Sequence, residues 1–241
     1  MDRFFTAALL LLVTLACSDR KPRIDYANQD TTEVTMNDMV RDTSRSLMAN
    51  LPVRFDSTEH LIYGLRVVDN DEKGSYLRSS SYKSNSDDSY FHNGNTLHGT
   101  YVNLIFEDAA GRRTLLTDKK LVITRVHYLR EIYRSTGKDY LLYLVRDYDS
   151  DGNGSVNTRD LQSMHMSRTD GSEFRKITAN MHELQDYRFI AGTDAMYFRT
   201  LEDSDKDGNL TDQDSYHHYV VDFTEKGYRV RANNPLDVLG L

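Results

Sequence analysis

The chain has one cysteine, three prolines and no tryptophan among its 241 residues. The single cysteine, Cys17, excludes an intrachain disulfide. The sequence also lacks the strings typical of nucleotide-binding loops, serine hydrolases and zinc proteases, and no carboxylate pair is set apart as an acid and a base. Its net charge of −7 argues against nucleic acid, which requires a basic face. We therefore predict no catalytic residues and no nucleic-acid partner.

The N-terminal apolar run, Phe4–Ala16, is shorter than the roughly 20 residues of a membrane-spanning helix. It ends in a small residue before Cys17, which is typical of a secretory signal. Leu15-Ala16-Cys17 resembles the bacterial lipobox. The resemblance implies that residues 1–16 are a signal peptide, that Cys17 is lipidated, and that membrane binding runs through this lipid. The expected location is the bacterial cell envelope, anchored in the outer membrane on its periplasmic or surface face, or secreted if lipidation fails.

The remaining chain is long enough for one domain with a proper core. Residues 17–33 are polar and are predicted to form a lipid-anchored tether, which leaves 34–241 as a single domain. Apolar residues near helical spacing in Val34–Leu51 predict a short helix that packs on a sheet, with Thr31 and Thr32 as its caps.

Two twelve-residue segments, 149–160 and 203–214, carry oxygen side chains at relative positions 1, 3, 5, 9 and 12, with glycine at position 6. Both are similar to the EF-hand ligand loop, in which the backbone carbonyl of position 7 adds another oxygen. The resemblance implies two Ca²⁺ sites. The predicted metal ligands are Asp149, Asp151, Asn153, Ser155, Asn157 and Asp160 in the first loop, and Asp203, Asp205, Asp207, Asn209, Thr211 and Asp214 in the second.

Two details of these loops bear on affinity. Aspartate replaces the usual glutamate at position 12, where its shorter arm reaches the ion less easily with two oxygens. A frame starting at Asp147 is also open, but the Asp149 frame agrees slot for slot with the second loop. Four carboxylates in the second loop against three in the first predict that the second binds more tightly. We expect structural calcium with affinity of about 10⁻⁴ to 10⁻³ M, as in extracellular modules; the alternative is that both segments are only acidic turns.

The flanks of both loops predict strands, unlike the helices of a true EF-hand. Tyr140–Val145 and Ala195–Phe198 precede the loops, and Leu161–Met166 and Tyr216–Phe223 follow them. These segments are short, rich in aromatic and aliphatic residues, and lack helical spacing. Tight turns and further strands come next, so the unit is strand, calcium loop, strand, turn, strand.

This unit recurs, which predicts three repeats at about 59–117, 118–178 and 179–232. The first copy has lost the acidic ladder and gained an insertion, Ser75–Asn95, so we assign it no metal. Repeats of this length with three or four strands are typical of β-propeller blades.

The string Met164–Thr178, with a turn at Asp170-Gly171 and the ending Lys-Ile-Thr, is similar to the repeat of TolB-like propellers, and Glu107–Thr117 has the same cadence. The resemblance implies an all-β, propeller-like array of antiparallel blades. Closed propellers have at least four blades. Residues 26–60 or 118–138 must then supply another blade, or the array is open and its edges are covered by another element or a second subunit. A β-sandwich is the alternative fold.

The sequence thus predicts a secreted, calcium-binding lipoprotein that acts as a binding or scaffolding module for an unidentified protein or glycan partner. A calcium-dependent adhesion module and an extracytoplasmic enzyme or its accessory domain are the alternatives. The tyrosine-rich Tyr76–Tyr90 is a candidate contact surface. His217 and His218 are adjacent, and on a strand they point to opposite faces, so they cannot jointly hold one ion.

Overall fold

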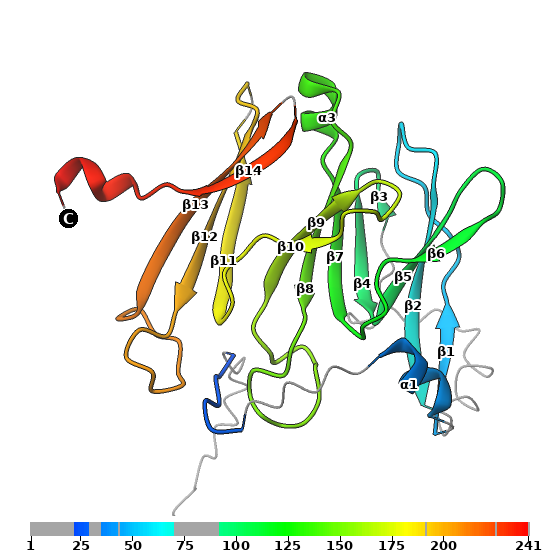
Figure 1. Ribbon diagram of the computed structural model, residues 1–241, viewed down its shortest axis with the longest axis horizontal. Helices are drawn as coiled ribbons and strands as arrows, with labels where there is room; N and C mark the ends of the chain where they lie inside the picture. The colour runs from blue at the N-terminus through cyan, green and yellow to red at the C-terminus, as the bar shows by residue number, and fades with distance from the viewer. Residues whose placement is uncertain are drawn as a thin grey trace, which may run out of the picture.

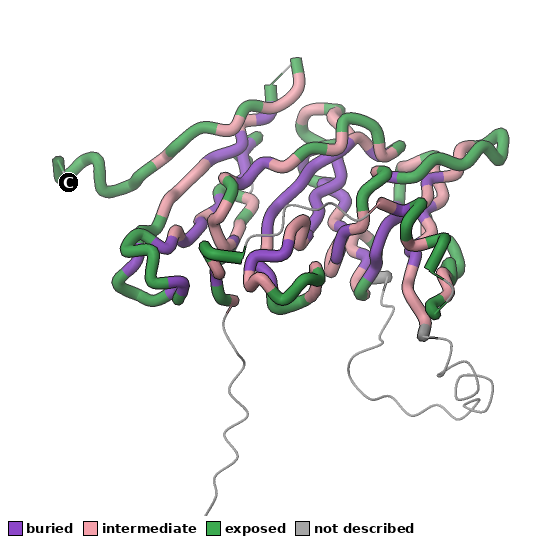
Figure 2. Tube along the Cα trace, turned by 60° about the horizontal axis from the view of Figure 1, so that its bottom comes forward, coloured by how far each residue is buried: buried purple, intermediate pink, exposed green. Residues whose placement is uncertain are grey.

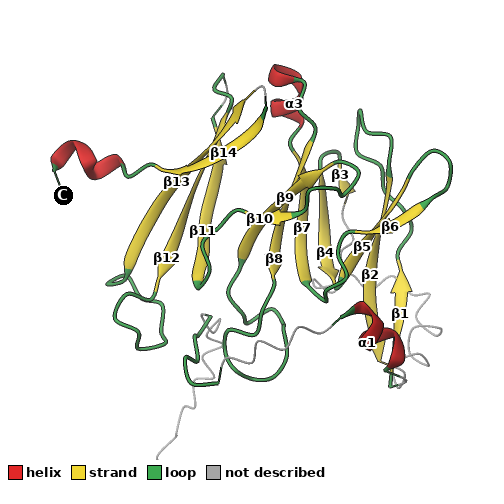
Figure 3. Ribbon diagram, in the orientation of Figure 1, coloured by secondary structure: helices red, strands yellow, loops and turns green. Residues whose placement is uncertain are grey.

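The structure is a computed structural model that describes residues 22–28, 35–42, 44–69, 92–190, 192–224 and 226–240. Within these residues the chain is all-β, as the strand patterns predict, and its strands form three antiparallel sheets (Figures 1 and 3). The predicted signal peptide, Cys17 and Tyr76–Tyr90 lie outside the described residues.

The three sheets follow one another along the chain. Sheet one has the order β1-β2-β5-β6, formed by Arg45–Ala49, Leu61–Asp69, Asn103–Glu107 and Arg113–Leu115. Sheet two has the order β10-β9-β8-β7-β4-β3, formed by Arg175–Lys176, Ser163–Arg168, Tyr140–Arg146, Val122–Tyr128, Thr96–Tyr101 and His92–Asn93. Sheet three has the order β11-β12-β13-β14, formed by His182–Phe189, Ala195–Glu202, Ser215–Thr224 and Gly227–Ala232.

Sheet two is the middle layer, with apolar cores on both of its faces (Figure 2). Strand β8 has only aliphatic and tyrosine side chains before its last residue, and alternate residues of a strand point to opposite faces. Leu141, Tyr143 and Val145 pack toward sheet one, and Tyr140, Leu142 and Leu144 pack toward sheet three. The continuous apolar run that predicts a buried strand therefore serves two cores at once.

The outer faces of the two flanking sheets are covered differently. On sheet one, Met36 of helix α1 (Met36–Arg41) packs against Leu65 and Val102. On sheet three, the outer face carries ion pairs, with Arg199 2.9 Å from Asp186. The outer face of sheet one is therefore covered by an apolar contact with a helix, whereas the outer face of sheet three is charged and exposed to solvent.

The helix prediction for Val34–Leu51 is only partly correct. Helix α1 ends at Arg41, and its N-cap is Thr35, which makes a capping box with Asp38, in place of Thr31 or Thr32. Residues Arg45–Ala49 instead form β1, because their register against β2 adds an edge strand to sheet one. Tertiary pairing overrides the helical spacing there.

Neither candidate range forms a fourth sheet among the described residues. Strand β1, from 26–60, joins sheet one, and β7, from 118–138, joins sheet two. The same range also contains an unpredicted helix, α3 (Arg130–Thr136), which ends at Gly137 in the left-handed conformation. The short 3₁₀ helix η2 (Pro235–Leu239) follows the last strand.

Candidate metal centres

The two predicted calcium loops occupy equivalent places in neighbouring sheets. The first joins β8 to β9 and the second joins β12 to β13, and both lie at the same end of the molecule (Figure 1). Strands flank each loop on both sides, so the β interpretation of the flanks is confirmed. In sheet one the equivalent connection, after β2, falls largely on residues 70–91, outside the described part of the chain.

In the second loop, the carboxylates of the first and last positions organise the backbone. Asp203 Oδ2 accepts a hydrogen bond from the Gly208 amide at 2.8 Å. Asp214 Oδ1 accepts from the Ser204 amide at 2.9 Å, and its Oδ2 accepts from the Thr211 amide at 2.8 Å. These bonds close the loop and bury both carboxylates.

The first loop repeats this pattern atom for atom. Asp149 Oδ2 accepts from the Gly154 amide at 2.5 Å. Asp160 accepts from the Ser150 amide at 2.8 Å through Oδ1 and from the Asn157 amide at 2.7 Å through Oδ2. The two segments thus share one conformation as well as one sequence pattern.

Three carboxylates come together in each loop. Single oxygens of Asp149, Asp151 and Asp160 lie within 4.8 Å of one another, and so do single oxygens of Asp203, Asp205 and Asp207. Like charges at this separation repel, and a dication between them removes the repulsion.

Other predicted ligands make bonds within their loops. Asn153 Oδ1 accepts from the Ser155 amide at 3.1 Å, and Asn157 Oδ1 accepts from the Arg159 amide at 2.9 Å. The Thr211 hydroxyl lies 3.2 Å from Asp214 Oδ2. Ser155 and Asn209 are exposed. The structure therefore gathers the carboxylates and leaves the neutral oxygens at the loop surface or in turns.

The buried carboxylates test whether a cation fits. Asp203 is 2 % exposed, and its Oδ1 is buried without a hydrogen-bond partner among the described residues. An unpartnered buried carboxylate oxygen is costly, and a bound cation would compensate it. In the first loop, burial raises the pKa of Asp160, because desolvation disfavours its charged form. Both loops thus contain buried negative charge that Ca²⁺ would stabilise.

Residues 22–28, which belong to the predicted tether, lie between the two loops, a position that the sequence did not predict. The Ile24 amide donates to Gly208 O of the second loop at 2.9 Å, and the Asp25 amide donates to Ser150 O of the first at 2.8 Å. Ile24 is 2 % exposed and packs with Leu161, Leu201 and Leu210. The only signal in the sequence is an isolated apolar residue within a polar stretch.

Tyr26 of the same segment lies beside the second loop, with its side chain 42 % exposed. The pKa of Tyr26 is raised to about 12, first by burial and then by the nearby carboxylate of Asp203. The tyrosine therefore stays protonated next to the first position of the loop.

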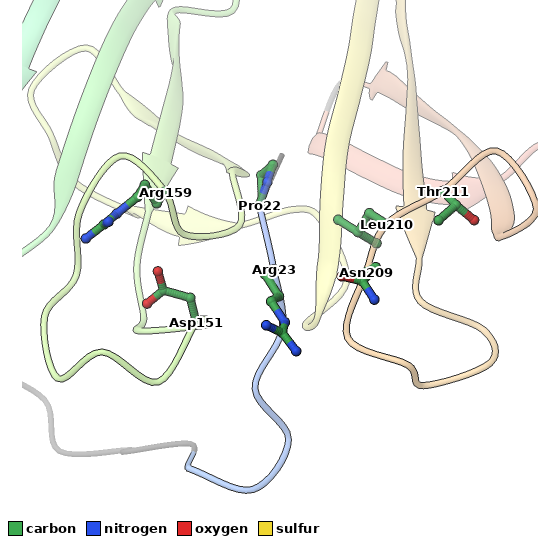
Figure 4. A pocket seen from close by; sticks show the side chains of 7 residues that line it. All are labelled: Pro22, Arg23, Asp151, Arg159, Asn209, Leu210 and Thr211. Atoms are coloured by element: carbon green, nitrogen blue, oxygen red, sulfur yellow. The ribbon is translucent and has the colours of Figure 1, made fainter. Parts of the chain in front are cut away.

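A groove of about 570 Å³ opens between the two loops and the N-terminal segment (Figure 4). Asp151 and Arg159 line it from the first loop, Asn209 and Thr211 from the second, and Arg23 stands between them. The lining carries charges of both signs.

Comparison with protein-family models, curated proteins and solved structures finds no match to this chain. Among the described residues, no helix has the length and apolar character needed to span a bilayer.

Proposed function

We propose that this protein is a calcium-stabilised scaffold of the bacterial cell envelope, lipid-anchored through Cys17, whose β domain binds or organises a protein or glycan partner. Calcium has a structural role in this proposal. The observation that carries it is the pair of matching acidic loops that hold residues 22–28 between them. That segment begins five residues after Cys17, so the loops fasten the chain close to its proposed anchor.

The hydrogen bonds to this segment explain how calcium would act. Both acceptors, Gly208 O and Ser150 O, are carbonyls of the loops themselves. Without calcium, the carboxylates within each loop repel one another and the loop deforms easily. Bound Ca²⁺ removes this repulsion and fixes the loop backbone, including the two acceptor carbonyls. Calcium outside the cell would therefore keep residues 22–28 of the tether bound to the two loops of the domain.

We also infer that the three sheets are successive blades of an open, propeller-like array. Three features support this arrangement: each sheet contains a four-strand run, the metal loops fall between equivalent strands, and a Gly171 turn joins β9 to β10. Helix α1 and the charged outer face of sheet three terminate the array in place of ring closure. A layered β-sandwich is the alternative description.

A calorimetric Ca²⁺ titration of the chelator-treated protein tests the metal sites. We expect two sites, with the tighter one lost in Asp203→Asn and the weaker one lost in Asp149→Asn. Asp212→Asn is the matched control, because Asp212 is an exposed residue of the second loop that occupies no ligand position. It removes the same charge and should retain both sites.

Two results would contradict the proposal. One is the absence of calcium binding up to several millimolar, beyond the range of about 10⁻⁴ to 10⁻³ M typical of extracellular modules. The other is equal loss of affinity in Asp212→Asn and Asp203→Asn, which would indicate a general charge effect.

A further inference from the structure

Sheet three brings together two histidines and a glutamate that lie far apart in the sequence. His182 is at the start of β11, Glu202 at the end of β12, and His217 near the start of β13, so three neighbouring strands each contribute one residue at the same end. One ligand atom from each lies within 4.8 Å of the others. His217 Nε2 is 2.7 Å from Glu202 Oε2, and His182 Nε2 is 3.8 Å from it.

The strand register places all three side chains on the face toward sheet two. His182 pairs with Glu202, and His217 pairs with Thr200, two residues before Glu202 on the same face. Phe198 and Tyr219, which belong to the core on that face, come next in the same rows. The cluster is thus at the rim of the core between sheets two and three, with Glu202 and His217 partly exposed, at 45 % and 37 %.

Thr200 orients His182. His182 Nδ1 lies 3.0 Å from Thr200 Oγ1, and Thr200 is fully buried. When Nδ1–H donates to this hydroxyl, Nε2 carries the lone pair and faces Glu202. A metal-ligating histidine commonly has such a partner on its other ring nitrogen.

The geometry leaves two acceptors facing each other. The His182 side chain is only 12 % exposed, and with Nδ1–H donating to Thr200 its Nε2 lone pair is directed toward Glu202. A neutral Nε2 lone pair and a carboxylate oxygen 3.8 Å apart gain nothing from each other. A cation placed between them binds both.

We propose that His182, Glu202 and His217 form a binding site for a divalent transition-metal ion of the zinc class. Two imidazole nitrogens and one carboxylate suit such an ion and do not suit Ca²⁺, which takes oxygen ligands. A tetrahedral zinc site separates its donor atoms by about 3.4 Å, given bond lengths of about 2.1 Å. His182 Nε2 lies 3.8 Å from Glu202 Oε2, close to this value. His217 Nε2 makes a hydrogen bond of 2.7 Å with the same oxygen, and the metal ion replaces this bond when Nε2 gives up its proton to solvent. A small rotation of the half-exposed Glu202 completes the three-ligand set and leaves the fourth position open to water or an external ligand.

Titration of the chelator-treated full-length protein with Zn²⁺, in excess Ca²⁺ so that the acidic loops are not the binding sites, tests this assignment. We expect one Zn²⁺ per chain, a rise in melting temperature on binding, and visible absorption of a four-coordinate ion when Co²⁺ replaces Zn²⁺. His217→Ala should weaken Zn²⁺ binding by at least about tenfold, and Thr200→Val, which removes only the orienting hydroxyl, by about tenfold.

His218→Ala is the matched control, because His218 is the next residue of β13 and faces away from Glu202. It should bind Zn²⁺ as the unchanged protein does. Melting curves without metal separate folding from binding: His217→Ala should melt at the same temperature as the parent and lose only the rise caused by Zn²⁺. The absence of a one-equivalent site, or equal weakening by His217→Ala and His218→Ala, would overturn the assignment.

Discussion

At the scale of single residues, the glycines at position 6 of the two loops have the same backbone conformation but different surroundings. Substituting each of them therefore distinguishes the stability that comes from the loop conformation from the stability that comes from contact with the N-terminal segment. Gly154 and Gly208 have φ of 82° and 84°. A Cβ on Gly154 would meet no atom within 4 Å, whereas a Cβ on Gly208 would lie 2.5 Å from Ile24 O. The same substitution therefore has different consequences in two loops of the same conformation.

We predict that Gly154→Ala lowers the free energy of unfolding by about 1–2 kcal/mol, the cost of a left-handed alanine. Gly208→Ala should lower it by at least about 1 kcal/mol more, since the new methyl group also displaces residues 22–28. Urea unfolding in saturating Ca²⁺ measures both. Equal losses would show that Ile24 O does not constrain the second loop.

Glu183 gives a prediction of pH dependence. Burial raises the pKa of Glu183 from 4.5 to about 7. The hydrogen bond that Oε2 accepts from the Gln162 amide at 2.6 Å acts in the opposite direction and lowers the pKa, but its effect is smaller. The folded state thus holds this proton more strongly than the unfolded state, so its contribution to stability is present below pH 4.5 and is lost as pH rises toward 7.

Glu183→Gln keeps an acceptor for the Gln162 amide and removes the charge. We expect the variant to be more stable than the parent by roughly 1–3 kcal/mol at pH 8, and equal to it near pH 4. Chemical unfolding at the two pH values measures the difference. A variant with the same advantage at both pH values would contradict the role of ionisation.

Candidate metal ligands could be identified from the sequence when the residues of one site lie close together along the chain, and not when they lie on separate strands. The acidic ladder from Asp203 to Asp214 is local, so spacing alone picks it out. His182 meets Glu202 and His217 only through the register of β11, β12 and β13. His217 and His218 are adjacent in β13 and so face opposite sides of the sheet, and nothing local points to His182.

At the scale of elements, Ile24 is the one residue of the segment 22–28 whose side chain is buried. Ile24 is 2 % exposed and contacts Leu161 from the first loop's end, Leu201 from β12 and Leu210 from the second loop. It therefore joins both loops to sheet three through one small core.

Ile24→Ala should lower the free energy of unfolding by about 2–4 kcal/mol, as for other buried large-to-small changes. Leu51→Ala is the control; Leu51 is 89 % exposed, and its loss should stay within about 0.5 kcal/mol. Urea unfolding in saturating Ca²⁺ again gives the values. If the two variants match, the segment does not contribute to the stability of the domain.

Strands could be predicted where a short run of apolar and aromatic residues lacks helical spacing, as in Tyr140–Val145 and Tyr216–Phe223. It was not predictable for Arg45–Ala49, because this edge strand depends on pairing with Leu65–Asp69. The helix at Met36–Arg41 is short, and its capping box at Thr35 and Asp38 was overlooked in favour of earlier threonines.

At the scale of the whole molecule, the acidic loops of two sheets and the N-terminal segment gather at one end (Figure 1). The proposed lipid anchor connects to that same end through residues 18–21. Calcium bound there would neutralise part of the net charge of −7 and link sheets two and three to the tether at once. The order of the sheets, by contrast, follows from apolar packing on both faces of sheet two and needs no metal.

Hydrogen exchange of the Ile24 and Asp25 amides, with and without Ca²⁺, shows whether calcium in the loops holds the N-terminal segment in place. Both amides donate to loop carbonyls, Gly208 O and Ser150 O. We predict that saturating Ca²⁺ slows their exchange by at least about tenfold relative to chelator-treated protein, while amides in the centre of β8 exchange at the same rate in both conditions. Unchanged exchange at Ile24 and Asp25 would contradict the claim that calcium in the loops holds the N-terminal segment.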